Sequence, residues 1–301
     1  MTAIFEQVLI LVIFCVTGYV LSKKGVVNAE QTNILSKLLV YVFSTCNVFK
    51  TFSSKFTVQY ITNNYKLLLI SVIVIILLAV TAHFIAKLFA KEKYKRNIYE
   101  YSITVPNYGY MGYALAEGLF GADGLIDFMM FGLPVNIYIY TIGFGILTKR
   151  GVSFKKLVNP LTIVISLGII FGLFNIPVPS VLSDVIDKSS ACMAPVSMLL
   201  AGITISQFDF KKLLVDKANY IIVMLRLVAV PVVIGITLNC FFDMNIVRTA
   251  LLFYTLPCGL NTIVFPKLVG ENCETGASLA LISTLVACVS VPLLLSLFNI
   301  G

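Results

Sequence analysis

Apolar residues run along most of this chain in long stretches that short polar segments separate. Each stretch has the roughly 17–25 residues that an α-helix needs to cross the hydrocarbon core of a bilayer. The pattern therefore predicts an all-α polytopic membrane protein with about ten spans. They lie near residues 4–22, 32–52, 66–90, 98–120, 124–147, 157–175, 190–207, 218–241, 246–269 and 276–298.

Positive charges are concentrated in alternate loops between these runs. The loops after the odd-numbered runs carry Lys23, Lys24, Lys91, Lys93, Lys95, Arg96, Lys149, Arg150, Lys155, Lys156, Lys211, Lys212 and Lys217. The loops after the even-numbered runs carry fewer, among them Lys55, Lys188 and Arg248. Because cytoplasmic loops are enriched in Lys and Arg, we expect a multi-pass protein of the cell inner (plasma) membrane with both termini outside.

The composition supports this class and argues against others. Hydrophobic residues make up 59% of the 301 residues and charged residues 12%, whereas soluble domains average about 45–50% and about 25%. The net charge of +8 follows from the loop pattern, so it does not indicate nucleic-acid binding. Seven cysteines form no C-x-x-C pair, and the chain has one histidine and no G-x-S-x-G, H-E-x-x-H or P-loop motif. We therefore expect no enzyme, metal site or cofactor.

Two proline-containing stretches interrupt the apolar runs at corresponding places. They are TVPNYGYMG (Thr104–Gly112) and TLPCGLNTI (Thr255–Ile263), and Pro257 follows Pro106 by 151 residues, half of the chain. Each proline removes a backbone donor, and such a break at membrane depth is tolerated where protein or a water-filled cavity satisfies the backbone. A single break is most often an ordinary kink. Two breaks at matching positions favour a functional site.

The spacing of the breaks predicts two halves of five spans, residues 1–150 and 151–301. Since five is odd, the second half lies inverted relative to the first. In transporters with inverted repeats, paired interrupted helices mark the substrate site near the bilayer midplane. The N-termini of the half-helices after each break carry partial positive charge, which suits an anion.

The residues around the breaks resemble the auxin efflux carrier family. The resemblance rests on NYGYMGYALAEGLFGADG (Asn107–Gly124), APVSMLLAGITIS (Ala194–Ser206) and LPCGLNTIVFPKLVG (Leu256–Gly270). This family includes plant PIN-type auxin exporters and bacterial malate or malonate permeases. The short central loop KRGVSFKK (Lys149–Lys156) favours the bacterial type.

The resemblance implies a fold and an arrangement of the spans. It implies ten helices in two inverted repeats, similar to the bile acid/sodium symporters. Spans 1, 2, 6 and 7 would form a scaffold, and spans 3–5 and 8–10 a moving transport domain in which spans 4 and 9 cross at their breaks. A homodimer through the scaffold is compatible with this family.

Polar residues beside the breaks are the candidate substrate contacts. Asn107 and Asn261 offer amide donors to a carboxylate without adding a buried charge, although each amide could instead cap the freed backbone. Tyr108, Gly109 and Thr262 are further candidates, and Asn136 is expected to support the crossing from span 5. The backbone of the breaks is shaped by Pro106, Pro257 and Gly259.

Three ionisable residues within the runs are candidates for charge compensation or coupling. Arg226 lies roughly 13 Å into span 8, where it either holds the crossing as a fixed cation, the role we favour, or faces an anionic substrate as its counter-charge. His83 could carry a coupled proton but has the pattern of an interfacial histidine. Glu117 is expected to be a structural or gating group.

These features together predict a secondary transporter of small organic anions, mono- or dicarboxylates such as malate or malonate. We expect elevator-type alternating access within membrane lipid, and the sequence leaves coupling to a proton or to sodium open. One alternative is a sodium-coupled symporter of larger amphipathic anions, but few acids lie near the breaks. Another is a channel or a ligand sensor, and the 301 residues contain no polar stretch long enough for an added soluble domain.

Overall fold

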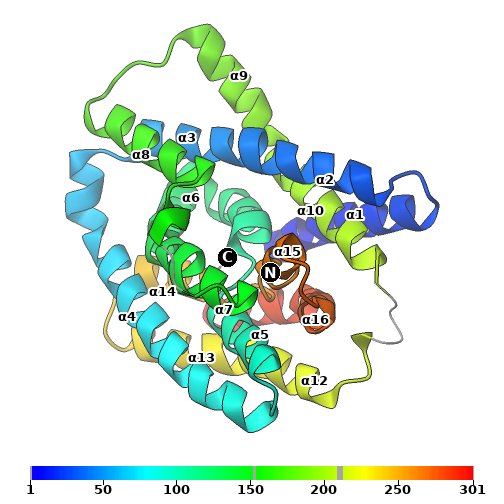
Figure 1. Cartoon of the computed structure of the whole chain (residues 1–301). Coiled ribbons are helices and arrows are strands. Elements are labelled where there is room, and N and C mark those ends of the chain that lie inside the picture. Colours follow the sequence, from blue (N-terminus) through cyan, green and yellow to red (C-terminus); the bar gives the residue numbers. More distant parts are fainter. Residues whose placement is uncertain (1, 152–153, 209–212, 301) are drawn as a thin grey trace.

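The computed structural model describes residues 2–151, 154–208 and 213–300. These residues form α-helices joined by short turns, and no β-strand is found among them (Figure 1). The first half contains α1 (Thr2–Lys23), α2 (Ala29–Leu38), η1 (Leu39–Phe43), α3 (Ser44–Lys55), α4 (Val58–Phe89), α5 (Lys93–Thr104), η2 (Tyr108–Gly112), α6 (Tyr113–Tyr138), η3 (Ile139–Gly143) and α7 (Phe144–Thr148).

The second half begins with the 3₁₀-helical turn η4 (Phe154–Leu157). It contains α8 (Pro160–Leu173), α9 (Ser180–Ala191), α10 (Met193–Ser206), α12 (Lys217–Met224), η5 (Leu225–Ala229), α13 (Val230–Asn239), α14 (Met244–Thr255), α15 (Asn261–Leu268) and α16 (Glu274–Leu297). The elements η1, η2, η3 and η5 are π-helical turns that continue into the helix after them.

Six helical segments in the described part of the chain are long and apolar enough to cross a membrane. They are Ile4–Lys23, Val58–Phe89, Tyr108–Thr148, Ser180–Ser206, Lys217–Asn239 and Glu274–Leu297. These segments agree with the integral membrane protein that the apolar pattern of the sequence predicts. The count falls below ten because several predicted spans are shorter or interrupted: α8 has 14 residues, and α14 and α15 have 12 and 8.

The 41-residue segment Tyr108–Thr148 covers parts of two predicted spans. Its helix α6 turns at Gly121, whose backbone has φ 66° and ψ −164°. A residue with a Cβ is strained in this region, so glycine permits the turn there. Gly270, which follows α15, also has a positive φ of 73°.

Helix starts coincide with polar residues at the ends of the apolar runs. The Asn28 side chain accepts from the backbone N–H of Gln31, whose side chain in turn accepts from the Asn28 N–H. The side chains of Thr57, Asn159 and Asp243 likewise each accept from a backbone N–H in the first turn of α4, α8 and α14. Such caps satisfy the N–H groups of the first turn, which have no partner within the helix.

One group of helices is held together by close backbone contacts. Helix α1 packs along α10, and α3 packs along α8 and α9 (upper part of Figure 1). A Cβ at Gly202 would lie 1.8 Å from the carbonyl oxygen of Cys15, and one at Gly172 would lie 2.5 Å from that of Phe52. Small residues at these contacts let membrane helices approach closely.

We expect Gly202→Ala to destabilise the α1–α10 pair. The new methyl group would meet backbone atoms that cannot rotate away, so the helices must separate, at an expected cost of about 1–3 kcal/mol. Thermal unfolding of the purified protein in detergent measures the change. Gly109→Ala is the matched control, since its Cβ would meet nothing within 4 Å. Equal unfolding temperatures for the two variants would contradict the close packing.

The second group of helices surrounds an aromatic core. Helix α4 packs on α5 and α6, and α14 packs on α6, α13 and α16. The ring of Phe253 lies 5.0 Å from that of Phe128, 5.2 Å from that of Phe131 and 5.3 Å from that of Tyr254. These side chains are fully buried, so α6 and α14 are fixed against each other just before the break that follows α14.

Candidate functional site

The two proline-containing stretches meet in space. Helix α5 ends at Thr104 and α14 ends at Thr255, and the residues after them are extended. An isolated antiparallel bridge joins Pro106 to Cys258. In it the Asn107 N–H donates to the Pro257 carbonyl at 2.8 Å, and the Gly259 N–H donates to the Val105 carbonyl at 3.2 Å. Each break therefore satisfies part of the backbone of the other.

Four helix ends converge at this crossing. The C-termini of α5 and α14 lead into it, and the N-termini of the continuous η2–α6 helix and of α15 lead out of it. Helix C-termini carry a partial negative charge and N-termini a partial positive charge, each about half an elementary charge. The carbonyl groups at the ends of α5 and α14 thus form a negative set at the crossing. The N–H groups at the starts of η2–α6 and α15 form a positive set.

Arg226 lies at the negative set. Its side chain is fully buried, and its Nη1 donates to the Tyr254 carbonyl in the last turn of α14 at 2.7 Å. Its guanidinium lies 5.5 Å from the centroid of the Tyr254 ring. Neither Nε nor Nη2 has a hydrogen-bond partner in the part of the chain that the structure describes. The guanidinium thus contacts the C-terminal turn of α14, and its role stays a prediction.

The positive set faces a cavity of about 460 Å³. Its lining includes seven residues predicted from the sequence: Pro106, Asn107, Tyr108, Gly109, Asn136, Gly259 and Asn261. It also includes Tyr41 and Ser44 from η1 and α3, and Val158–Leu161 from the start of α8. We call it the crossing cavity.

The amides in the crossing cavity have different surroundings. Asn107 is 5% exposed, and its side-chain oxygen has no hydrogen-bond partner among the described residues. Asn261 donates through Nδ2 to the Tyr101 hydroxyl at 2.9 Å. The Asn136 oxygen accepts from the Tyr108 hydroxyl at 2.5 Å. Asn107 is therefore the amide most available to a ligand, and Asn136 holds Tyr108 in place.

Three other predicted residues lie outside the cavity lining. Thr262 is fully buried, and its hydroxyl donates to the Gly259 carbonyl at 2.9 Å, so it supports the break after α14. His83 pairs with Glu100 at 2.8 Å between α4 and α5. Glu117 is exposed on α6, one turn before Gly121. The structure thus does not place His83 or Glu117 at the crossing.

Aromatic residues that sequence reasoning did not single out also line the crossing cavity. The unpredicted members are Tyr41, Tyr110, Tyr113, Tyr140, Phe144 and Phe265. Tyr140 and Phe144 pack against Phe265, with ring centroids 6.2 Å and 5.1 Å apart. In an apolar run such residues have the pattern of ordinary core packing. One sequence feature could have indicated part of this aromatic lining: Tyr108, Tyr110 and Tyr113 follow closely after Pro106.

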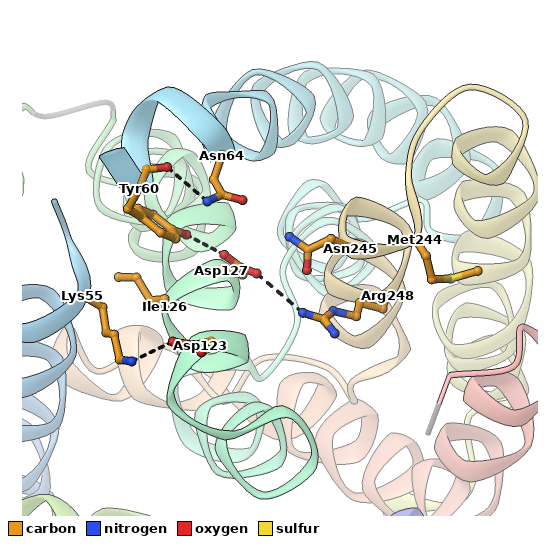
Figure 2. Close-up of a pocket in the computed structure, with 9 residues that line it drawn as sticks. All are labelled: Lys55, Tyr60, Asn64, Asp123, Ile126, Asp127, Met244, Asn245 and Arg248. Atoms are coloured by element: carbon orange, nitrogen blue, oxygen red, sulfur yellow. Dashed lines mark hydrogen bonds and ion pairs between the residues drawn. The ribbon is translucent and has the colours of Figure 1, made fainter. Parts of the chain in front are cut away.

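A second pocket of about 520 Å³ lies at the ends of the helices where α3 stops and α4 and α14 start (Figure 2). Tyr60 donates to Asp127 at 2.7 Å, and Arg248 approaches the same carboxylate at 3.8 Å. Lys55 pairs with Asp123 at 2.8 Å. The charges of the two cations and two acids that line this pocket cancel. The pocket is therefore a weaker candidate for the binding of a charged substrate.

A polar network ties α5 to α12 and α16 near the other ends of the helices. The Tyr99 hydroxyl donates to Asn219 at 2.8 Å, and Asn219 donates to Ser278 at 2.7 Å. Lys95 pairs with Asp216 beside them. Burial opposes the charge of Asp216, but hydrogen bonds from Lys95 and the Ala218 N–H hold its pKa below the usual value. The network joins half-helices from both halves of the chain.

Comparison with known proteins identifies the family of the chain. A family model described as "Membrane transport protein" matches residues 3–156 and 150–295. An uncharacterized transporter of Methanothermobacter thermautotrophicus is 23% identical over 96% of both chains. An uncharacterized transporter of Methanocaldococcus jannaschii is 22% identical over 67% of this chain and 68% of its own. The chain therefore belongs to the membrane transport protein family, the auxin efflux carrier family that its break motifs resemble.

Proposed function

We propose that the protein is a secondary transporter that binds a small organic anion by its carboxylate in the crossing cavity. The observation that carries this proposal is the meeting of the two interrupted segments at one cavity. There the amides of Asn107 and Asn261 stand beside two helix N-termini. Such N-termini bind carboxylates through their N–H groups and their partial positive charge.

The charges at the crossing support an anion site. Arg226 donates to the last turn of α14, where its positive charge opposes the partial negative charge of that C-terminus. The N-termini of η2–α6 and α15 are left without a compensating side-chain charge, because none of the described residues lining the cavity is charged. An anion entering the cavity supplies that compensation.

We further propose the ten-span arrangement that the sequence predicts. Residues 1–150 and 151–301 would form inverted repeats. The first packing group (α1–α3 with α8–α10) would be the scaffold, and α4–α7 with α12–α16 the transport domain. With both termini outside, the loop before residue 158 and the end of α15 would lie on the cytoplasmic side. Residues 158–161 and Leu268 line the crossing cavity, so the cavity would open toward the cytoplasm. Sliding of the transport domain would carry the cavity to the other face.

An ion pair between the two groups gives a test of this movement. Lys55 ends α3 in the scaffold, and Asp123 lies on α6 in the transport domain. We expect a bifunctional thiol linker between Lys55→Cys and Asp123→Cys to stop transport while substrate binding remains. Cys192 and Cys240 are exposed and would first be replaced by serine. A linker joining two transport-domain residues, Asp123→Cys and Arg248→Cys, is the control. Unimpaired transport by the first linked protein would contradict the sliding.

Binding itself is tested by thermal unfolding of the purified protein with and without acids. A ligand that binds only the folded state stabilises it, by about 2.7 kcal/mol at a concentration one hundred times its Kd. We expect a carboxylic acid to raise the unfolding temperature and the corresponding amide to leave it unchanged. Stabilisation by the amide alone would contradict an anion site.

A further inference from the structure

We propose that the second pocket binds a zwitterion, a small aliphatic α-amino acid, at a site separate from the crossing cavity. Met244 at the start of α14 lines the second pocket, and Leu268 at the end of α15 lines the crossing cavity. The two pockets thus include opposite ends of one interrupted helix. The proposed binding of an anion at the crossing does not use the second pocket.

The first argument is a buried acid in the wall of the second pocket. Asp127 on α6 is 6% exposed, and no other Asp or Glu is buried in the part of the chain that the structure describes. One of its oxygens accepts from the Tyr60 hydroxyl at 2.7 Å. The other lies 3.8 Å from Nη2 of Arg248, which is too far for a hydrogen bond. A ligand ammonium can therefore contact that oxygen.

The second argument is a pair of unused polar atoms beside Asp127. Nε of Arg248 is buried, and so is the side-chain oxygen of Asn245, and neither has a hydrogen-bond partner among the described residues (Figure 2). A guanidinium donates through several N–H groups to one carboxylate, and an amide oxygen accepts from an ammonium. Arg248 and Asn245 thus offer one contact to each charge of a zwitterion.

The third argument is the closeness of opposite charges in the pocket. Lys55 and Asp123 pair with each other at 2.8 Å, which leaves Arg248 and Asp127 as the charges facing a ligand. A simple anion at Arg248 would lie against Asp127, and a simple cation at Asp127 would lie against Arg248. Each would meet a like charge, which disfavours its binding. An α-amino acid carries both charges on one carbon atom, so it can face both residues together.

The remaining lining suits an aliphatic side chain. Ile126 and Met244 give the pocket of about 520 Å³ an apolar part, and such surface favours a ligand side chain that leaves water. None of the described residues lining the crossing cavity is charged, so a ligand ammonium finds no opposite charge there. The second pocket is therefore the site for an amino acid.

A bound amino acid would also affect transport, and this consequence rests on the proposed function. Asp127 and Arg248 belong to the proposed transport domain, and Lys55 of the scaffold pairs with Asp123 at the same pocket. A ligand that fills the pocket beside this ion pair opposes movement of the transport domain past α3. We expect it to slow transport from a site that the substrate does not occupy.

Binding is tested with labelled leucine on the purified protein and its displacement by two compounds of the same shape. One is 4-methylpentanoate, which lacks the ammonium, and the other is 3-methylbutylamine, which lacks the carboxylate. We expect each to compete at least about tenfold more weakly than leucine, because each loses a charge-assisted contact. Asp184→Asn, on the exposed face of α9, is the matched control and should bind leucine as the wild type does. Competition by either compound that equals leucine would overturn the zwitterion site.

Two substitutions should shift the preference in opposite directions. Asp127→Asn keeps an acceptor for Tyr60 but loses the charge, so it should weaken leucine binding and favour 4-methylpentanoate over 3-methylbutylamine. Arg248→Gln should also weaken leucine binding but favour the amine. Leucine affinity that falls in Asn107→Ala and not in Asp127→Asn would place the amino acid in the crossing cavity and overturn the proposal.

Uptake in liposomes separates this inference from the proposed function. Leucine should lower the maximal rate of carboxylate uptake and leave the acid concentration for half that rate unchanged. A change in that concentration alone would contradict a separate site. No leucine binding by folded wild type would overturn the inference and leave the anion transporter intact. Leucine binding without uptake of any carboxylate would support the site and overturn the proposed function.

Discussion

Replacing Asn107 by alanine is expected to weaken carboxylate binding strongly and to leave a folded protein. The backbone of Asn107 holds the bridge, because its N–H donates to Pro257 and its carbonyl accepts from the N–H groups of Met111 and Gly112. Alanine keeps these three bonds. The side-chain amide has no described partner for its oxygen, so its removal takes little from the fold and removes the most available ligand group.

Binding of a labelled acid to the purified variant measures this effect. Losing a hydrogen bond to a charged group is expected to weaken binding by about 1.5–3 kcal/mol, which is roughly 10- to 150-fold. Asn64→Ala is the matched control, since that amide lies in the second pocket and donates to the Tyr60 carbonyl. Unchanged affinity in Asn107→Ala, with normal unfolding temperature, would remove Asn107 from the site.

Arg226→Gln is expected to damage the fold more than any substitution in the cavity wall. The substitution removes a buried charge that opposes the C-terminus of α14 and leaves a neutral donor in its place. Losing a hydrogen bond from a charged group costs about 1.5–3 kcal/mol, and the C-terminus of α14 loses its opposing charge as well. We therefore expect a large fall in unfolding temperature, with the charge preference of any remaining binding unchanged.

The alternative role of Arg226 predicts a different outcome. If the guanidinium is the counter-charge of the substrate, Arg226→Gln should stay folded and shift its preference toward neutral ligands. Unfolding temperature and competition by an acid and its amide, measured on the same preparation, separate the two roles. Arg226→Lys, which keeps the charge, should recover part of the stability in the fixed-cation account.

The crossing could be located from the sequence because proline and glycine act locally. Pro106 and Pro257 lack the N–H that a helix needs, and α5 and α14 end two residues before them. Proline alone does not end a helix here, because Pro134 lies inside α6. The spacing of the breaks then indicated that they meet. The bridge between Pro106 and Cys258 is a consequence of that spacing, although its hydrogen bonds depend on the tertiary fold.

The roles of individual side chains near the breaks were harder to predict. Thr262 is one residue from Asn261, but its hydroxyl turns back to Gly259 and is fully buried. Which side of a short half-helix faces the cavity depends on how α15 packs on α16, and sequence distance from a break does not give it. Tyr140 and Phe265 escaped attention because an aromatic residue in a span is equally suited to core and cavity.

Charged residues show the same limit. His83 looked eligible for proton coupling because of its usual pKa range, yet it lies beside Glu100, away from the crossing cavity. Asp127 drew no attention in the sequence, since one acid near a span end is common. In the structure it joins Tyr60 and Arg248 from two other helices (Figure 2).

Uptake of labelled acids by the purified protein in liposomes tests the central claim most directly. Each acid would be tried with an imposed proton gradient, a sodium gradient and neither, and the Asn107→Ala protein would be measured in parallel. The account predicts saturable uptake of a carboxylate by the wild type and much weaker uptake by the variant at the same concentration of acid. The gradient that concentrates the acid identifies any coupled ion. Equal uptake by both proteins, or no uptake of any carboxylate by folded wild type, would contradict an anion carrier at the helix crossing.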